Sequence, residues 1–227
     1  MTCNGGPLLD GRCPVCSHSV AVPFFEGGDQ PLAILAWPES SQEAKGLRRY
    51  PLNYVMCPQC THVWNRSFSP ETLPYEKQPN LMFNDGDIWQ GHLSVIREEV
   101  IAELPPNPTV IEIGCGEGHF IKGIAQALDG GGRFIGFDPL SSLSSTVDLE
   151  FYGEYFSPEL HVPKFEPDLL IMRHVLEHLT DQASLMEKLA WSATQLSKPV
   201  FFFAETPCID KALATHRLVD FYQEHPS

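Results

Sequence analysis

The spacing of apolar residues predicts alternating strands and helices over the second half of the chain. A helix with one apolar face begins near Ile88 and ends before Pro105 and Pro106, which cannot continue it. Another helix follows a cap at Thr180 or Asp181. Short apolar runs between such segments predict buried strands, namely TVIEI, RFIGF, LEFYGEYF, DLLIM and VFFFA. This alternation predicts an α/β fold with a Rossmann-like, parallel, doubly wound sheet that binds its ligand at the carboxyl ends of the strands.

A glycine-rich turn follows the first of these strands, within TVIEIGCGEG at Thr109 to Gly118. Glycines permit a sharp turn and a close approach of the backbone to a ligand. The glycines of the turn are Gly114, Gly116 and Gly118. Glu112 stands two residues before the first glycine, and Asp138 ends the next apolar strand, where a carboxylate can hold ribose hydroxyls. The alternative is a tight turn without a ligand. Cys115, inside the turn, is interpreted as a small buried filler.

Two CxxC pairs near the start of the chain predict a structural zinc site made by Cys13, Cys16, Cys57 and Cys60. Each CxxC turn presents two sulfurs to one ion, and four thiolates complete a tetrahedron. A redox dithiol and cysteines used as core filler are the alternatives. A histidine follows each pair by two residues, and both histidines are interpreted as bystanders. The short apolar pieces between the pairs suggest a β-rich module too small to fold without the metal.

The charge and composition of the chain exclude some classes of protein and partner. The 15 Lys and Arg residues against 29 Asp and Glu give a formal net charge of -14, which repels phosphate backbones, so we expect no nucleic-acid partner. The chain starts without an export signal, and no apolar run is long enough to cross a bilayer. We therefore expect a cytoplasmic protein with no membrane partner. In that compartment, seven cysteines favour thiolate or metal chemistry over disulfides.

Two segments rich in histidine and acid follow predicted strands. The first, His174 to His178, has an HxxEH pattern found in some zinc proteases, but it leaves a buried strand instead of lying within a long helix. We therefore predict that both histidines line the cofactor or substrate pocket; hydrogen-bonded polar groups without a chemical role are the alternative. The second, FYQEHPS, places Tyr222, Glu224 and His225 together. A histidine can remove a proton next to a carbonyl while a phenol donates to the oxyanion; a solvated helix end is the alternative.

The glycine turn and its preceding acid resemble motif I of the class I methyltransferases, E/D-x-G-x-G-x-G. The resemblance implies S-adenosylmethionine as the cofactor, bound by the turn from Glu112 to Gly118 and by Asp138, with His174 in its pocket. Over essentially the whole chain, the order of motifs is also similar to the zinc-containing C-methyltransferases of nucleotide-linked deoxyketosugars. Those enzymes have two CxxC pairs, a connector tyrosine, a methyltransferase core, a histidine after strand four and a Tyr-x-Glu-His segment after strand five.

The residues that match the acceptor side of this family are Tyr75, His178, Tyr222, Glu224 and His225. The resemblance implies that His225 removes the proton next to the ketone of a nucleotide sugar, and that a tyrosine helps to hold the enolate. This chain departs from the family in its connector, which is not serine-rich after the tyrosine. O- or N-methylation of another small molecule, and a docking protein that binds the cofactor without turnover, are the alternatives.

The expected domains are a zinc-binding domain over residues 1–68, a connector or substrate lid over 69–87, and a methyltransferase core over 88–227. The core is expected to lack its last strands, because a class I sheet has seven strands and no convincing strand follows Pro207. VFFFA would then form an exposed apolar edge. We expect a missing C-terminal domain or a partner to cover it.

Overall fold

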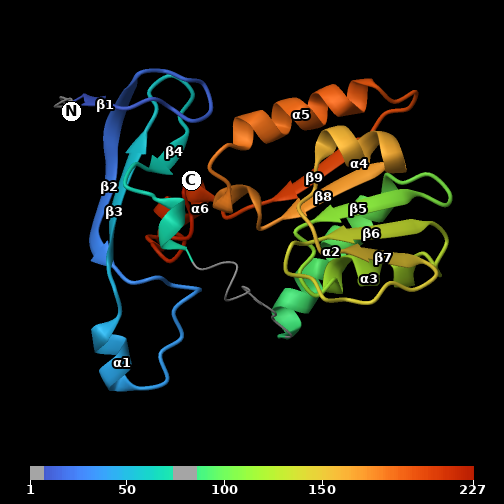
Figure 1. Cartoon of the computed structure of the whole chain (residues 1–227), viewed down its shortest axis with the longest axis horizontal. Coiled ribbons are helices and arrows are strands. Elements are labelled where there is room, and N and C mark those ends of the chain that lie inside the picture. Colours follow the sequence, from blue (N-terminus) through green and yellow to red (C-terminus); the bar gives the residue numbers. More distant parts are fainter. Residues whose placement is uncertain (1–7, 74–85) are drawn as a thin grey trace. The chain divides into compact units, whose positions relative to one another are not determined.

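The computed structural model describes residues 8–73 and 86–227, which form two compact units (Figure 1). The first unit contains residues 8–73, 177–184 and 207–227. The second contains residues 86–176 and 185–206. The chain therefore passes from the second unit to the first at residue 177, re-enters the second unit at residue 185, and continues in the first unit from residue 207.

The second unit is built on a parallel sheet in the order β7-β6-β5-β8-β9. Its strands are β5 (Thr109–Ile113), β6 (Arg133–Phe137), β7 (Leu149–Tyr152), β8 (Leu169–Arg173) and β9 (Phe201–Glu205). The order reverses between β5 and β8, so the sheet has the topological switch point at which doubly wound sheets bind ligands. The predicted fold class is confirmed.

Helices cover both faces of this sheet (Figure 1). They are α2 (Asp87–Ala102), α3 (His119–Ala127), α4 (Pro158–Phe165) and α5 (Gln182–Thr194). Successive residues of β5 point to opposite faces: Val110 packs in a core with α2 and α3, and Ile111 packs in a second core with α4 and α5. The strands are therefore apolar on both sides, as in other buried parallel sheets.

The first unit contains an antiparallel sheet in the order β1-β2-β3-β4. Its strands are β1 (Leu9–Asp10), β2 (Val20–Gln30), β3 (Tyr50–Met56) and β4 (Val63–Asn65), with α1 (Ser41–Gly46) between β2 and β3 and the short helix η1 (Pro70–Thr72) after β4. One small core surrounds the cysteine pairs, with Cys13, Cys57, Val55 and Trp64 among its members. This sheet and cysteine cluster fit the predicted zinc domain.

The last segment of the chain belongs to this first unit. Helix α6 (Ile209–Ala214) and Phe221 pack against β3 through Leu52 and Tyr54. The Phe221 ring meets the Tyr54 ring edge-on at 5.1 Å. By its contacts, the segment 207–227 groups with the cysteine-bearing sheet, and the expected extent of the methyltransferase core, residues 88–227, remains a prediction.

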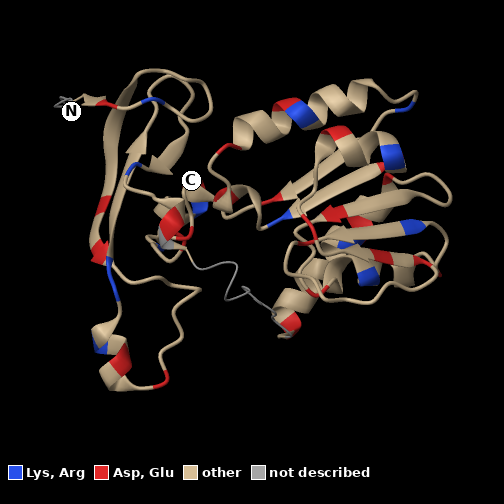
Figure 2. Ribbon diagram, viewed as in Figure 1, with Lys and Arg blue, Asp and Glu red and all other residues tan. Residues whose placement is uncertain are grey.

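Strand β9 lies at one edge of the parallel sheet, and two of its aromatic side chains are partly exposed, Phe201 at 45% and Phe202 at 38%. A covering domain or partner for this edge remains a prediction. Acidic residues occur on elements of both units (Figure 2), in keeping with the net charge of -14. Within residues 8–73 and 86–227, none of the helices combines the length and apolar character needed to cross a membrane.

Candidate active site and metal centre

The turn after β5 is held against the end of β6. The amides of Gly114 and Cys115 donate to the carbonyl of Phe137 at 2.7 and 3.1 Å, and the turn then enters α3 at Gly118. The helix thus begins directly after the carboxyl end of the central strand, where its first amides favour a polar or anionic group. Burial raises the pKa of the Cys115 thiol, which keeps it protonated and inert, as expected of a filler.

The three positions of the turn require glycine for different physical reasons. All three have φ between 51° and 72°, a region that other residues rarely adopt. A Cβ on Gly114 would lie 2.3 Å from Val175 Cγ2, and one on Gly118 would lie 2.7 Å from the Phe151 ring. A Cβ on Gly116 would meet no heavy atom within 4 Å. Gly114 and Gly118 are therefore required by packing within the protein, whereas Gly116 borders open space where a ligand can approach.

Glu112 stabilises the start of α3, the helix that follows the glycine turn. Its side chain is buried, and its carboxylate accepts a hydrogen bond from the amide of Ile121 at 3.1 Å, in the first turn of α3. It thereby satisfies one of the amides that a helix start leaves without an internal partner. Burial raises the pKa of Glu112 to about 7, despite the opposing charge of Arg173. The predicted contact of Glu112 with the cofactor remains untested, while its contact with α3 is direct.

Asp138 follows β6 and faces the same turn. Its Oδ2 accepts from the amide of Gly116 at 3.0 Å, and its Oδ1 accepts from the amide of Leu140 at 2.9 Å. The predicted ribose-binding acid is therefore next to the one glycine of the turn that borders open space. This combination fits a nucleoside held between the glycine turn and the acid, the arrangement implied for S-adenosylmethionine. We infer that Asp138 and Gly116 belong to its binding site.

His174 follows β8 and takes a left-handed backbone conformation, with φ 53°. Its Nε2 lies 3.8 Å from Glu205 at the end of β9. Glu205 also accepts a hydrogen bond from Arg173 Nε at 2.6 Å and is bonded to His92 Nε2 at 2.7 Å. The Trp89 ring lies beside His174, with ring centroids 6.0 Å apart. The carboxyl ends of β8 and β9 thus carry a charged cluster, and sequence reasoning found only His174 in it.

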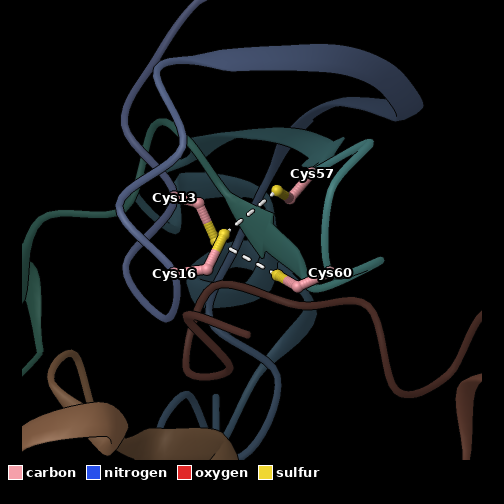
Figure 3. A group of neighbouring side chains, drawn as sticks. All are labelled: Cys13, Cys16, Cys57 and Cys60. Carbon is pink, nitrogen blue, oxygen red and sulfur yellow. Dashed lines mark hydrogen bonds between the residues drawn. The ribbon is translucent and has the colours of Figure 1, made fainter.

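The four predicted zinc ligands converge (Figure 3). Cys13 Sγ lies 3.6 Å from Cys60 Sγ, and Cys16 Sγ lies 3.5 Å from Cys57 Sγ. Four sulfurs at about 2.3 Å from a tetrahedral zinc ion lie roughly 3.8 Å apart. The cysteines therefore fit zinc with little movement, and a closed shell of four sulfurs leaves no position for a substrate.

The two CxxC turns have the same backbone structure. In each, the amide of the first cysteine donates to the carbonyl five residues on: Cys13 N–H to the His18 carbonyl and Cys57 N–H to the His62 carbonyl, both at 2.8 Å. His62 stacks on Trp64 with the ring planes 12° apart. The backbone carbonyls of both histidines therefore support the turns, and their interpretation as bystanders to the metal remains a prediction.

The acid-base residues expected on the acceptor side also come together, within the first unit. The rings of His178 and His225 meet edge-on with centroids 4.7 Å apart, and the Tyr222 and His225 rings lie 4.0 Å apart. His178 lies in the short helix η2 (Leu176–His178), and His225 is 5% exposed. Tyr75 lies outside the described residues.

Backbone carbonyls fix the tautomer of both histidines. His178 Nδ1–H donates to the Glu224 carbonyl at 2.7 Å, and His225 Nδ1–H donates to the Asp220 carbonyl at 2.9 Å. A carbonyl oxygen only accepts, so the proton of each neutral ring stays on Nδ1. The lone pair is then on Nε2, the atom that can take a proton or bind a metal.

Glu224 is fully buried and anchors the segment. Its Oε1 accepts from the amides of Ile34 and Leu35 at 2.8 and 3.0 Å. Tyr54 Oη donates to the carbonyls of Tyr222 and His225 at 2.9 and 2.8 Å, and burial raises the pKa of this phenol, which keeps it a donor. The geometry supports a positioning role for Glu224. Sequence reasoning missed Tyr54, because its partners are about 170 residues away.

The strand order, the glycine turn and the acid after β6 together define a protein of the class I methyltransferase type. A family profile described as "Methyltransferase domain" matches residues 90–226, and the chain belongs to this family. Membership of this family implies S-adenosylmethionine as the cofactor of the domain.

Among solved structures, a cyclopropane-fatty-acyl-phospholipid synthase-like protein from Lactobacillus casei is similar to this chain. The identity is 16% and the TM-score 0.34, over 45% of this chain and 46% of that one. The chain thus spans less than half the length of that protein. The search of curated proteins gives no match.

Proposed function

We propose that the enzyme methylates carbon next to the carbonyl of a nucleotide-linked ketosugar, with His225 as the base. The observation that carries this proposal is the Nδ1–H bond of His225 to the Asp220 carbonyl, which leaves the lone pair of the neutral ring on Nε2. A base of this kind is needed for carbon, which becomes a nucleophile only after it loses a proton beside a carbonyl. An oxygen or nitrogen acceptor has no such need for an enolate.

In this mechanism, His225 Nε2 takes the proton, and the electrons of the carbon–hydrogen bond move to the carbonyl oxygen. Tyr222, whose ring contacts that of His225, donates a hydrogen bond to the resulting enolate. When bound, the cofactor would supply an electrophilic methyl group on a sulfonium. Asp138 and the glycine turn would hold that cofactor, and His178 would assist on the acceptor side.

Proton removal can be measured without methyl transfer. A nucleotide-linked 4-ketosugar is incubated in heavy water with the enzyme and the demethylated cofactor product, and NMR follows loss of the proton next to the ketone. The wild type should exchange this proton, and His225→Ala should slow exchange by roughly a hundred- to ten-thousand-fold, the contribution of a positioned general base. Tyr222→Phe should slow it less.

His216→Ala provides the matched control, because His216 is an exposed histidine of the same unit. It should exchange at the wild-type rate. Exchange by His225→Ala at the wild-type rate would move the base to another residue, with His178 next. Methylation of an oxygen or nitrogen acceptor without any ketosugar exchange would replace carbon methylation by that reaction.

A further inference from the structure

Glu177 completes a group of three potential metal ligands with His178 and His225. One ligand atom from each residue lies within 4.8 Å of those of the other two. Glu177 and His225 are each 5% exposed, and His178 is half-buried. All three residues belong to the first compact unit. Two imidazoles and a carboxylate are therefore gathered at a place separate from the four cysteines.

The hydrogen bonds of the two histidines match those of metal-ligating histidines. Such residues almost always donate their second ring N–H to a carbonyl or carboxylate, which fixes the ring and its tautomer. His178 does so to the Glu224 carbonyl and His225 to the Asp220 carbonyl, both through Nδ1. Each neutral ring therefore presents the Nε2 lone pair.

The backbone that accepts these bonds is itself held in place. Tyr54 donates to the carbonyls on either side of Glu224, and the Glu224 carboxylate binds two amides of another loop. Asn65 adds a bond from its side chain to Gln223 at 3.1 Å, and its amide donates to the Pro226 carbonyl at 2.8 Å. A site whose supporting groups are fixed in this way loses little freedom when a ligand binds.

We propose that Glu177, His178 and His225 bind a divalent transition metal ion, zinc in the first place, at a second site distinct from the cysteine cluster. A set of two histidines and one glutamate is a known donor set for zinc with an open fourth position. Donor atoms at about 2.0–2.2 Å from a tetrahedral ion lie roughly 3.3–3.6 Å apart. Donor atoms up to 4.8 Å apart would have to approach one another by up to roughly 1.2–1.5 Å to reach this spacing.

Metal at this site would occupy the lone pair of His225 and prevent it from taking a proton. The ion should therefore inhibit the methyltransferase reversibly, by competing with the proton for Nε2 of His225. This consequence rests on the proposed function, whereas metal binding itself does not.

Cobalt distinguishes the two sites by their ligands. The full chain, with zinc in its cysteine cluster, is titrated with Co²⁺. Wild type should bind one further equivalent, with visible d–d absorption and without the intense near-ultraviolet charge transfer of a cobalt thiolate. Glu177→Gln and His178→Gln should each weaken this binding at least ten-fold, as expected on loss of a ligand. His216→Gln, at an exposed histidine of the same unit, should bind as the wild type.

Thermal unfolding and zinc content verify that the variants are folded. The proposal is overturned if the wild type takes up no second ion, if the absorption shows thiolate ligands, or if both ligand variants bind cobalt as tightly as the wild type. Two variants at different ligands keep this test decisive when one of them fails to fold.

The inhibitory role is tested with the proton-exchange assay under the same metal titration. Exchange should fall in proportion to occupancy of the second site and return after dialysis. Exchange that continues unchanged at full occupancy would overturn the inhibitory role. A wild-type protein that binds cobalt but never exchanges the ketosugar proton would contradict the proposed function. The same result would still support the metal site.

Discussion

The glycine turn allows a direct test of which backbone position faces the cofactor. Alanine at Gly114 and alanine at Gly116 impose the same kind of backbone strain, because both residues have positive φ, 72° and 51°. That strain costs about 1–2 kcal/mol for an L-residue. The two positions differ in their surroundings, since a Cβ at Gly114 meets Val175 Cγ2 at 2.3 Å and a Cβ at Gly116 meets nothing within 4 Å.

Gly114→Ala should therefore lose more stability than Gly116→Ala. An inserted methyl group in a packed region adds about 1–3 kcal/mol to the backbone strain, which gives a total of about 2–5 kcal/mol for Gly114→Ala. Gly116→Ala should lose only about 1–2 kcal/mol of stability. In contrast, its affinity for S-adenosylmethionine should fall at least ten-fold, or about 1.4 kcal/mol, because the methyl group enters the space beside Asp138.

Chemical unfolding gives the stabilities, and calorimetric titration with S-adenosylmethionine gives the affinities. A double-mutant cycle with Val175→Ala isolates the clash, since the smaller side chain leaves room for the added Cβ at Gly114. The coupling energy should be favourable by about 1–3 kcal/mol. Wild-type affinity in a folded Gly116→Ala protein would refute the assignment of this glycine to the cofactor site, and a coupling energy of zero would refute the steric explanation for Gly114.

Three further predictions concern the metal, the cofactor and pH. Cys57→Ser should abolish zinc binding and expose residues 207–227 to proteases, while the affinity for S-adenosylmethionine is retained. Metal analysis, limited proteolysis and calorimetry measure these three effects. A variant that still binds zinc would contradict the prediction. Asp138→Ala should weaken S-adenosylmethionine binding by about 1.5–3 kcal/mol per hydrogen bond lost. Wild-type protein that binds NADH with an affinity comparable to that for S-adenosylmethionine would contradict this assignment of the site. Burial raises the pKa of Glu112 from 4.5 to about 7, so the stability that its protonated form provides below pH 4.5 should be lost as the pH rises to about 7, a change of about 3 kcal/mol. Urea unfolding across this range should show the slope in wild type, and an equal slope in Glu112→Gln would assign it to another group.

Local signals predicted much of the parallel sheet and both binding motifs. The strand and the turn with Gly114 to Gly118 are adjacent in sequence, so their pattern can be recognised without knowledge of the fold. The CxxC pairs can be recognised in the same way, because the residues of each pair form a turn by themselves. Helix α4 was not predicted, since Pro163 interrupts its helical pattern in the sequence.

Long-range contacts account for what sequence reasoning missed. The tail with His225 gave no sign that it packs on β3, because Tyr54 and Phe221 become neighbours only after the chain returns from the second unit. Glu177 was recognised only as part of an HxxEH pattern. Its proximity to His225, 48 positions further along the sequence, requires the folded structure.

The position of the cysteine cluster gives it an influence on the acid-base residues without any chemical role of its own. Tyr54 on β3 and Asn65 on β4 are paired across the sheet, and the turn with Cys57 and Cys60 joins these two strands. Both residues bond to the Tyr222–Pro226 segment, Tyr54 to two of its carbonyls and Asn65 to the Gln223 side chain and the Pro226 carbonyl. A metal ion that closes this hairpin therefore also fixes the groups that hold His225. Through this connection, the proposed methyl transfer would depend on a metal ion that has no chemical role in the reaction.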